Sequence, residues 1–335
     1  MVLPLAVTMG DPAGCGPLIT VQAWHQRRAL ALPPFYVIAL PDLFQDRAEI
    51  RLIQDPAEAI NAFDQALPIL PLSQAGLPPP QAGSPDPNFA ASILSSIELA
   101  THHTLTGQAR AIVTNPISKA VLYAAGFSHP GHTEFLAALC QEAEPERTRP
   151  PVMMLIGGGL RVALMTIHIP LHQVFEQLTP NHMRRTCETV LLALKRDFQI
   201  ATPRLALCGL NPHAGESGTI GREEIELINP VAAKLRAEGH HVTDARPGDT
   251  VFHEALEGAY DAVLAMTHDQ GLIPVKTLDF WGGVNTTLGL PIIRTSPDHG
   301  TAYDAAKTGQ VRPDSLIAAL LQAAALSQSK GSAHA

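Results

Sequence analysis

Short apolar runs alternate with amphipathic stretches along the whole chain. The runs that predict buried strands are LPLAVTM, FYVIAL, ARAIVTNP, 152–156, 161–167, 204–210, 261–266 and GLPIIRTS. Helical periodicity covers 18–30, 89–106, 117–125, 181–197, 223–238 and the last stretch DSLIAALLQAAALS. Strands that alternate with helices in this way predict an α/β protein built on a largely parallel sheet.

Length and composition extend this picture to two lobes. The chain has 335 residues, of which 46% are apolar and 16% charged, so it can bury more than one simple core. The 29 prolines and 25 glycines suit many short connections. Residues 67–88 are rich in Pro, Gly and Ser and predict a surface excursion or an extended strap.

The charge and the cysteines narrow the class of partner and compartment. A net charge of -8 with no Lys/Arg cluster argues against nucleic acid and anionic membranes as partners. The four cysteines form no CxxC pair, which is typical of a reducing compartment. The start, MVLPLAVTMGDPAG, lacks a basic region and predicts a first buried strand, and no apolar run reaches the length of a membrane span. We therefore expect a cytoplasmic protein, in which a local basic pocket would still attract a phosphorylated or carboxylated substrate.

Three histidines, His168, His213 and His268, each follow an apolar run and precede a turn signal. In open α/β sheets, ligands bind beyond the carboxyl ends of the strands. The three imidazoles could therefore meet at one metal ion and leave coordination positions for water or substrate. For any one histidine taken alone, a hydrogen-bonded structural role is the more common explanation. For three in the same context the structural and the metal-binding interpretations are about equal, and both stay open.

Two glycine-rich segments are candidates for anion binding. GDPAGCGP (10–17) lies between a strand and a helix but departs from GxGxxG, so a structural turn explains it as well. GFSHPGHT (126–133) has the spacing of a phosphate loop, but His132 replaces the lysine and the segment follows a helix, which excludes a nucleotide triphosphatase. His132 and Thr133 would lie at a helix N-terminus, where an anion is favoured. The alternative is that Thr133 caps this helix, with Glu134 in its first turn.

Other polar residues occur beside apolar runs. Lys276 follows His268 within ten residues, in a segment that otherwise predicts a surface loop with scattered charges. Asn285 and Arg294 flank a predicted strand, and a buried Arg294 guanidinium would need an anionic partner. Asp249 could cap a helix, orient a histidine or act as a base. The sequence has no GxSxG motif, which argues against covalent hydrolysis.

Nine motifs together resemble one family over nearly the whole chain. They are GDPAGCGP, TNPISK, GHTEF, TIHIPL, NPHAGE, DTVF, HDQGLIPVK, GVNTTLGLPIIRTS and DHGTA. In order and spacing they are similar to the 4-hydroxythreonine-4-phosphate dehydrogenases (the PdxA family) of pyridoxal phosphate biosynthesis. The resemblance implies a two-lobed α/β/α subunit similar to isocitrate and isopropylmalate dehydrogenases.

The resemblance also implies a homodimer, with the active site in an interlobe cleft at the dimer interface and metal ligands shared between subunits. Residues 1–130 and 290–335 would form the first, cofactor-side lobe, and 131–289 the second, metal- and substrate-side lobe.

The resemblance also implies residue roles. The implied metal ligands are His168, His213 and His268. The implied substrate-binding residues are His132, Thr133, Lys276, Asn285 and Arg294. On a weaker analogy with the related dehydrogenases, the cofactor contacts are His299, Gly300 and Asp304. The proton acceptor would be Lys276 or Asp249.

The implied reaction uses NAD, or NADP, and one divalent ion, for which Zn, Mg, Mn and Co are all compatible. 4-Phosphohydroxy-L-threonine would be oxidised at C3 to a β-keto acid that decarboxylates to 3-amino-2-oxopropyl phosphate. Alternatives are a related dehydrogenase acting on a phosphothreonate or a cyclic dihydrodiol dicarboxylate, a metal-dependent hydrolase, or a binding protein without catalysis. The family commonly reads GDPAGIGPE where this chain has Cys15 and Leu18, so any role of an acid at position 18 is in doubt.

Overall fold

The computed structural model describes residues 3–73 and 78–328, and the chain divides into two compact units. Unit 1 comprises Met1–Thr148 and Leu290–Ala335, and unit 2 comprises Arg149–Gly289. Residues 131–148, expected in the second lobe, belong to unit 1. The reason is that helix α5 (His132–Ala143) packs against α3 (Ala90–Leu105) of unit 1.

Unit 1 contains a parallel sheet with the strand order β3-β4-β2-β1-β5-β12. The strands are β1 (Leu5–Thr8), β2 (Phe35–Ala39), β3 (Ile50–Leu52), β4 (Leu67–Pro71), β5 (Ile112–Val113) and β12 (Arg294–Pro297). Every residue of β1 and β2 is buried, as the continuous apolar runs predict for a sheet covered on both faces. The strap expected over 67–88 is wrong at its start, because β4 is a strand of this sheet; part of the strap, 74–77, lies outside the described residues.

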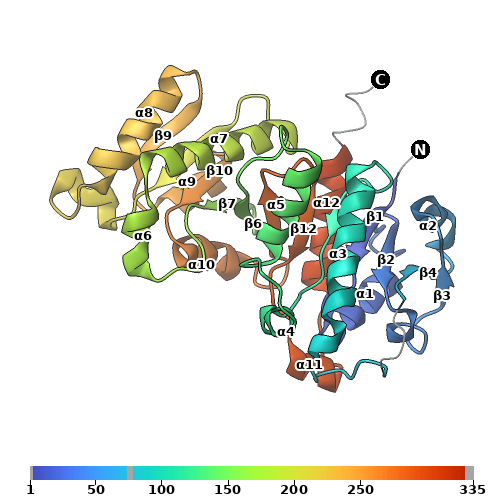
Figure 1. Cartoon of the computed structure of the whole chain (residues 1–335). Helices are drawn as coiled ribbons and strands as arrows, with labels where there is room; N and C mark the ends of the chain where they lie inside the picture. Colours follow the sequence, from blue (N-terminus) through green and yellow to red (C-terminus); the bar gives the residue numbers. More distant parts are fainter. Residues whose placement is uncertain (1–2, 74–77, 329–335) are drawn as a thin grey trace. The chain divides into compact units, whose positions relative to one another are not determined.

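The helices of unit 1 come from both ends of the chain. They are α1 (Gly16–His25), α2 (Ala59–Ala62), α3, α4 (Lys119–Ala124), α5, α11 (Tyr303–Thr308) and α12 (Asp314–Ser327), with short helices at Pro41–Leu43, Pro56–Glu58 and Pro87–Phe89. Helix α12, red in Figure 1, packs against β12, β5 and β1 and also against α1, so the last helix lies beside the first strand and helix.

Unit 2 contains a mixed sheet with the strand order β11-β6-β7-β10-β8-β9. The strands are β6 (Val152–Gly157), β7 (Leu160–Leu164), β8 (Arg204–Cys208), β9 (His241–Arg246), β10 (Ala262–Ala265) and β11 (Val284–Leu288). Strand β6 is antiparallel to both of its neighbours, whereas β7, β10, β8 and β9 are parallel. The sheet is largely parallel as expected, and β6 is the exception because Gly158 and Gly159, both with positive φ, join it to β7 as a tight hairpin.

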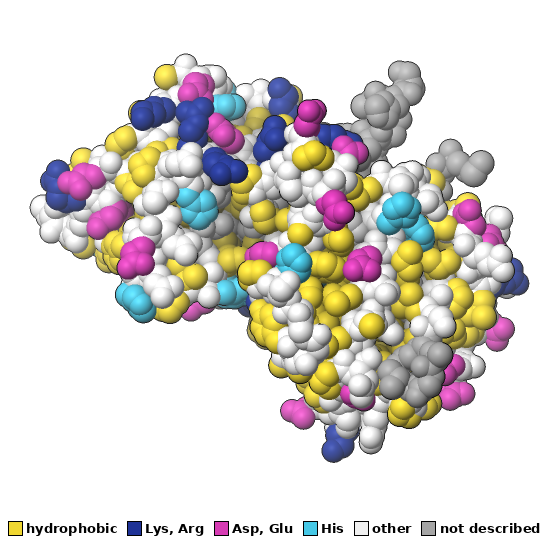
Figure 2. Space-filling model, in the orientation of Figure 1, with side chains coloured by type: hydrophobic (Ala, Val, Ile, Leu, Met, Phe, Trp, Pro, Cys, Tyr) yellow, Lys and Arg dark blue, Asp and Glu magenta, His cyan; other side chains and the backbone are white. Residues whose placement is uncertain are grey.

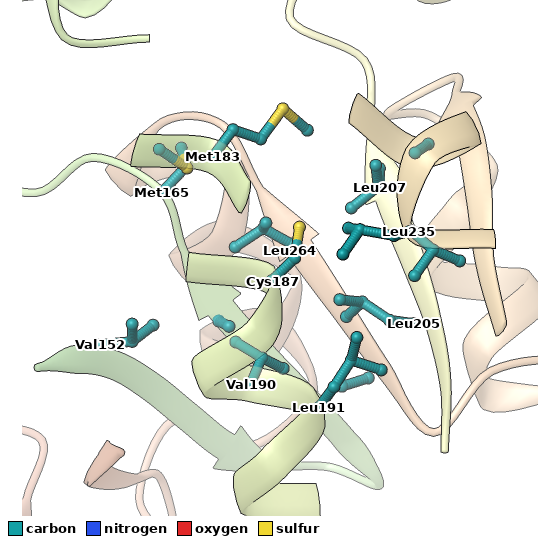
Figure 3. Packing of buried hydrophobic residues seen from close by; sticks show 14 of the residues in the cluster. Val152, Met165, Met183, Cys187, Val190, Leu191, Leu205, Leu207, Leu235 and Leu264 are labelled. Atoms are coloured by element: carbon teal, nitrogen blue, oxygen red, sulfur yellow. The ribbon is translucent and has the colours of Figure 1, made fainter. Parts of the chain in front are cut away.

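The core of unit 2 lies between its sheet and its longest helix. The helices are α6 (Leu171–Gln177), α7 (Pro180–Arg196), α8 (Asn229–Ala237), α9 (Val251–Leu256) and α10 (His268–Leu278), with a 3-10 segment at Pro212–Gly218 and a π-helical turn at Glu224–Ile228. In Figure 3, Cys187 and Leu191 of α7 lie close to Leu205 and Leu264 of the strands, and all four are buried. Each buried leucine of this kind contributes about 1.5–3 kcal/mol.

Lys and Arg side chains gather over α7 and α8 on the face shown in Figure 2. They are interspersed with acids: Arg184 pairs with Glu188 and Glu238, and Arg236 pairs with Asp244. This face therefore has mixed charge and is not a continuous basic patch. Among residues 3–73 and 78–328, no helix combines the length and the apolarity that a membrane crossing needs.

Candidate active site

The strands that precede the three histidines are neighbours in the sheet of unit 2. Strands β7, β10 and β8 are adjacent and parallel, so their carboxyl ends lie at the same edge. His168 follows β7, His213 follows β8, and His268 begins α10 directly after β10. The fold therefore delivers all three histidine-bearing segments to one edge of the sheet, where ligands bind in α/β proteins.

Side-chain hydrogen bonds fix these strand ends to one another. Thr166 donates its hydroxyl to the Met266 carbonyl at 2.7 Å. Gln270 accepts from the Met266 amide at 2.8 Å and donates to the Gly209 carbonyl, also at 2.8 Å. Gln270 thus joins the end of β10 to the end of β8. Its role depends on these tertiary contacts and has no signal in the sequence.

His168 and His268 form a pair at this edge. Their ring centroids are 5.4 Å apart, and together with Thr166 and Leu171 they line a small cavity of about 170 Å³. His268 Nδ1 lies 2.8 Å from Asp269 Oδ1. A proton on Nδ1 that is donated to Asp269 leaves Nε2 as the lone-pair nitrogen, which is the arrangement of a carboxylate-oriented metal ligand. Asp269 is a site residue that the sequence alone did not reveal, although its position next to His268 is a usable signal.

His213 lies in the 3-10 segment Pro212–Gly218, in a left-handed backbone conformation with φ 51° and ψ 31°. Over residues 3–73 and 78–328 of this single chain, no group of three His, Cys, Asp or Glu side chains is placed to hold a metal ion. One chain therefore brings together His168 and His268, but not the whole set of three histidines named from the sequence.

The segment that carries His268 and Lys276 is a helix, α10, so the alternative explanation of a surface loop with scattered charges does not hold. Gly271 and Pro274 interrupt the helical pattern of its sequence. Gly271 is required because α10 packs tightly on β7, and a Cβ at this position would overlap the Leu164 side chain. Lys276 Nζ lies 5.7 Å from the centroid of the Phe280 ring.

Two further candidates of unit 2 lie on other elements. Asn285 is on β11, half-buried, and its Oδ1 has no hydrogen-bond partner. Asp249 is exposed between β9 and α9. It does not cap α9, because Thr250 occupies the N-cap position.

Arg294 is the first residue of β12 in unit 1, and its guanidinium is buried, with 4% of the residue exposed. Nε and Nη2 donate to the Thr114 hydroxyl at 3.1 and 2.7 Å. Burial lowers the pKa of Arg294 to about 10, and the Glu134 carboxylate opposes this shift. The single strand expected between Asn285 and Arg294 is wrong, since the two residues lie on separate strands, β11 and β12.

His132 is the first residue of α5, after the N-cap Gly131. Thr133 is therefore not the cap, whereas Glu134 does lie in the first turn as predicted. His132 Nε2 is buried and has no hydrogen-bond partner. Burial, and secondly the charge of Arg294, holds the pKa of His132 well below its usual value, so the imidazole is neutral at pH 7. A neutral ring with an unpartnered nitrogen next to a buried cation suits a polar, anionic ligand.

The first glycine-rich turn and the DHGTA loop form one local structure in unit 1. The Cys15 amide donates to the Thr301 carbonyl at 2.8 Å, and Cys15 Sγ lies 4.0 Å from His299 Nδ1. The Tyr303 hydroxyl donates to Asp11 at 2.7 Å. Burial raises the pKa of Asp11, although the Tyr303 hydrogen bond opposes it.

The residues proposed for the cofactor lie on the exposed side of this structure. His299 and Gly300 are exposed in the DHGTA loop, and Asp304 is exposed in the first turn of α11. Leu18, which stands where the family commonly has an acid, is half-buried. It lines a cavity of about 200 Å³ together with Pro12 and Gly14.

A family model described as "Pyridoxal phosphate biosynthetic protein PdxA" matches residues 25–323. The chain belongs to the PdxA family. The 4-hydroxythreonine-4-phosphate dehydrogenase of Maricaulis maris is 49% identical to it, over 97% of this chain and 98% of the relative. The crystal structure of the Klebsiella pneumoniae 4-hydroxythreonine-4-phosphate dehydrogenase matches with a TM-score of 0.86 and 38% identity, covering 97% of this chain and 100% of that one. A terephthalate 1,2-cis-dihydrodiol dehydrogenase from Burkholderia xenovorans matches with a TM-score of 0.65 and 26% identity, covering 97% and 98%. The family match confirms the resemblance that the motifs indicated. The structural match to the Klebsiella pneumoniae enzyme confirms the predicted α/β fold.

Proposed function

We propose that this PdxA-family protein is an NAD-dependent and divalent-metal-dependent 4-hydroxythreonine-4-phosphate dehydrogenase. It oxidises 4-phosphohydroxy-L-threonine at C3, and the β-keto acid formed loses CO₂ to give 3-amino-2-oxopropyl phosphate. The observation that carries the substrate class is the buried Arg294 guanidinium beside the unpartnered His132 nitrogen. A dehydrogenase that is 49% identical over nearly the full length supports the reaction class.

The anionic groups of the substrate explain why unit 1 buries a cation. A guanidinium taken out of water destabilises the fold unless an anion compensates it, and it binds phosphate or carboxylate through a planar fork of donors. The N-terminus of α5, where Thr133 lies in the first turn, adds backbone amides and the positive end of a helix dipole. Arg294, His132 and Thr133 therefore bind an anionic group of the substrate. Lys276 and Asn285 are the corresponding proposed substrate ligands of unit 2.

The histidine pair of unit 2 fits a divalent ion. Asp269 holds Nδ1 of His268, so Nε2 remains for a ligand, and His168 lies beside it. His168, His213 and His268 would hold the ion. Because neutral imidazoles carry no negative charge, the ion would keep its full positive charge. Zinc, magnesium, manganese and cobalt all suit this donor set. When bound, the ion would supply Lewis-acid polarisation of the substrate hydroxyl, and a nicotinamide cofactor would supply the hydride acceptor. Lys276 or Asp249 accepts the hydroxyl proton.

We further propose a homodimer in which a second subunit completes the metal site. Leu171 and Phe175 of α6 and Ile273 of α10 are 72%, 55% and 64% exposed, and Leu171 lines the same cavity as the histidine pair. Large apolar side chains grouped at a polar site are typical of a surface that another protein covers. Burial of this surface in a dimer would place a partner chain next to His168 and His268.

His299, Gly300 and Asp304 are the proposed contacts of the nicotinamide cofactor. The turn 10–17 supports their loop through the Cys15–Thr301 hydrogen bond. The cysteine in place of the family's isoleucine is accommodated, because Cys15 is buried against this loop.

A second candidate function is oxidation of a cyclic dihydrodiol dicarboxylate, which the similarity to the Burkholderia xenovorans enzyme favours. Dependence of turnover on the substrate phosphate separates the two. The experiment compares kcat/KM for 4-phosphohydroxy-L-threonine, for unphosphorylated 4-hydroxy-L-threonine, for a phosphothreonate and for a cis-dihydrodiol dicarboxylate. The proposal predicts the highest value for the first compound by at least two orders of magnitude over the second. A higher value for the diol would replace the proposed substrate.

A further inference from the structure

The loop that carries His213 has an unusual backbone. His213, Ala214, Gly215, Glu216 and Ser217 are five successive residues in the left-handed region, with φ of 51°, 51°, 79°, 44° and 55°. Only the third is glycine, so four residues adopt a conformation that is sterically unfavourable for L-amino acids. Such a segment persists only where surrounding contacts determine it, and these places are often functional.

Glu224, the first residue of the π-helical turn Glu224–Ile228, supplies these contacts. The residue is 1% exposed. Its Oε1 accepts from the backbone amides of Leu210 and Asn211 at 2.9 and 2.7 Å, and its Oε2 accepts from Asn211 Nδ2 at 3.0 Å. The carboxylate therefore receives three donors from Leu210 and Asn211, two of the residues between β8 and the left-handed turn.

The same carboxylate lies against the middle of the turn. A Cβ placed on Gly215 would be 2.6 Å from Glu224 Oε2 and 2.7 Å from the Gly221 carbonyl. Gly215 is buried, and its carbonyl accepts from the Ile220 amide at 3.2 Å. Glu224 thus holds the entry of the turn by hydrogen bonds and contacts its centre directly.

We propose that Glu224 is a positioning residue that holds the left-handed turn and thereby sets the direction of the His213 imidazole. This inference rests on the proposed function in one respect, namely that His213 is a metal ligand. A carboxylate is required because it presents only acceptors to three converging donors. A glutamine of the same shape would turn its NH₂ toward Asn211 Nδ2 or toward the two backbone amides, and one donor would face another.

The first test measures the turn itself, in the metal-free full-length protein, by amide hydrogen exchange. Glu224→Gln is compared with Glu226→Gln, an exposed carboxylate on the same turn that pairs with Arg222. We expect exchange at Leu210 and Asn211 to be faster by about 10- to 100-fold in Glu224→Gln, because hydrogen bonds to a charged group are lost. Glu226→Gln should exchange like the wild type. Unchanged protection in Glu224→Gln would overturn the proposal.

The second test measures affinity for Co²⁺ by its visible absorption, with His213→Ala as the reference. We expect Glu224→Gln to bind Co²⁺ about 10- to 100-fold more weakly, as for other residues that orient a ligand, and Glu226→Gln to bind normally. If His213→Ala weakens binding and Glu224→Gln does not, the positioning role is wrong. If His213→Ala binds Co²⁺ normally, the metal-ligand assignment fails instead, and the exchange result still decides whether Glu224 holds the turn.

A second variant covers the case in which Glu224→Gln does not fold. Gly215→Ala keeps the Glu224 carboxylate but places a methyl group against its Oε2. The same loss of protection and of Co²⁺ affinity is expected in this variant. Wild-type values for both measurements would contradict the role of the Glu224–Gly215 contact.

Discussion

Replacing Arg294 by methionine should greatly weaken use of the substrate without destabilising the protein. Methionine has a similar length, is apolar and fits a buried position. Burial moves the pKa of Arg294 from 12.5 to about 10, and at ~1.4 kcal/mol per pKa unit the buried charge costs about 3 kcal/mol of stability. The two hydrogen bonds to Thr114 offset this by about 1 kcal/mol each. The variant should therefore be as stable as the wild type or more stable by up to about 2 kcal/mol.

The effect of the same change on catalysis should be large and of opposite sign. Loss of the buried cation leaves an anionic group of the substrate without its partner, which costs about 3–5 kcal/mol in such sites. We expect kcat/KM to fall by about two to four orders of magnitude.

Urea denaturation and steady-state kinetics measure the two effects on one preparation. Arg110→Met is the matched control, since burial also lowers the pKa of Arg110 in unit 1 but this residue has no proposed role at the site. The control should keep its kcat/KM. The reasoning is refuted if Arg294→Met keeps wild-type kcat/KM, or if it is destabilised by more than about 2 kcal/mol, which would indicate a structural ion pair.

Three further predictions concern pH, metal affinity and packing. The pKa of His132 is held well below 6.5 in the folded protein. Below about pH 6.5 this histidine therefore binds a proton in the unfolded chain but not in the folded one, so the free energy of unfolding falls as the pH drops. His132→Asn should reduce the slope of unfolding free energy against pH by up to ~1.4 kcal/mol per pH unit in urea titrations between pH 6.5 and 5, and an unchanged slope would count against a buried neutral ring. Asp269→Asn should weaken metal binding about tenfold by calorimetric titration, because Asp269 orients His268, and an unchanged affinity would remove that role. Gly271→Ala should cost about 1–3 kcal/mol in urea, because the new methyl group overlaps Leu164, and wild-type stability would show that α10 can move off β7.

The strands and the positions of their ends could be predicted because their signals are local. Apolar runs such as 204–210 and 261–266 carry their own strand propensity, and a polar residue after each run marks the edge where ligands bind. His213 and His268 were therefore named without knowledge of which strands pair. That β7, β10 and β8 are neighbours depends on long-range contacts, and only the structure shows it.

The features that the sequence did not reveal depend on tertiary contacts or on residues that contradict local propensity. Strand β6 has the apolar pattern of a parallel strand, and its direction follows from the Gly158–Gly159 turn, a signal that was present but not used. Helix α10 contains Gly271 and Pro274, which lower helix propensity but are tolerated where the helix packs on β7. The roles of Gln270 and Glu224 depend on which backbone groups approach them, which no periodicity encodes.

The most direct test of the proposed function is NAD reduction with 4-phosphohydroxy-L-threonine, measured together with CO₂ release. The assay is run on the protein with added divalent ion and again after chelation. The account predicts equal amounts of NADH and CO₂, loss of both on chelation, and recovery when the ion is restored. Full turnover after complete removal of the ion would contradict the metal-dependent mechanism. No turnover by a folded, dimeric, metal-loaded protein would contradict the proposed substrate.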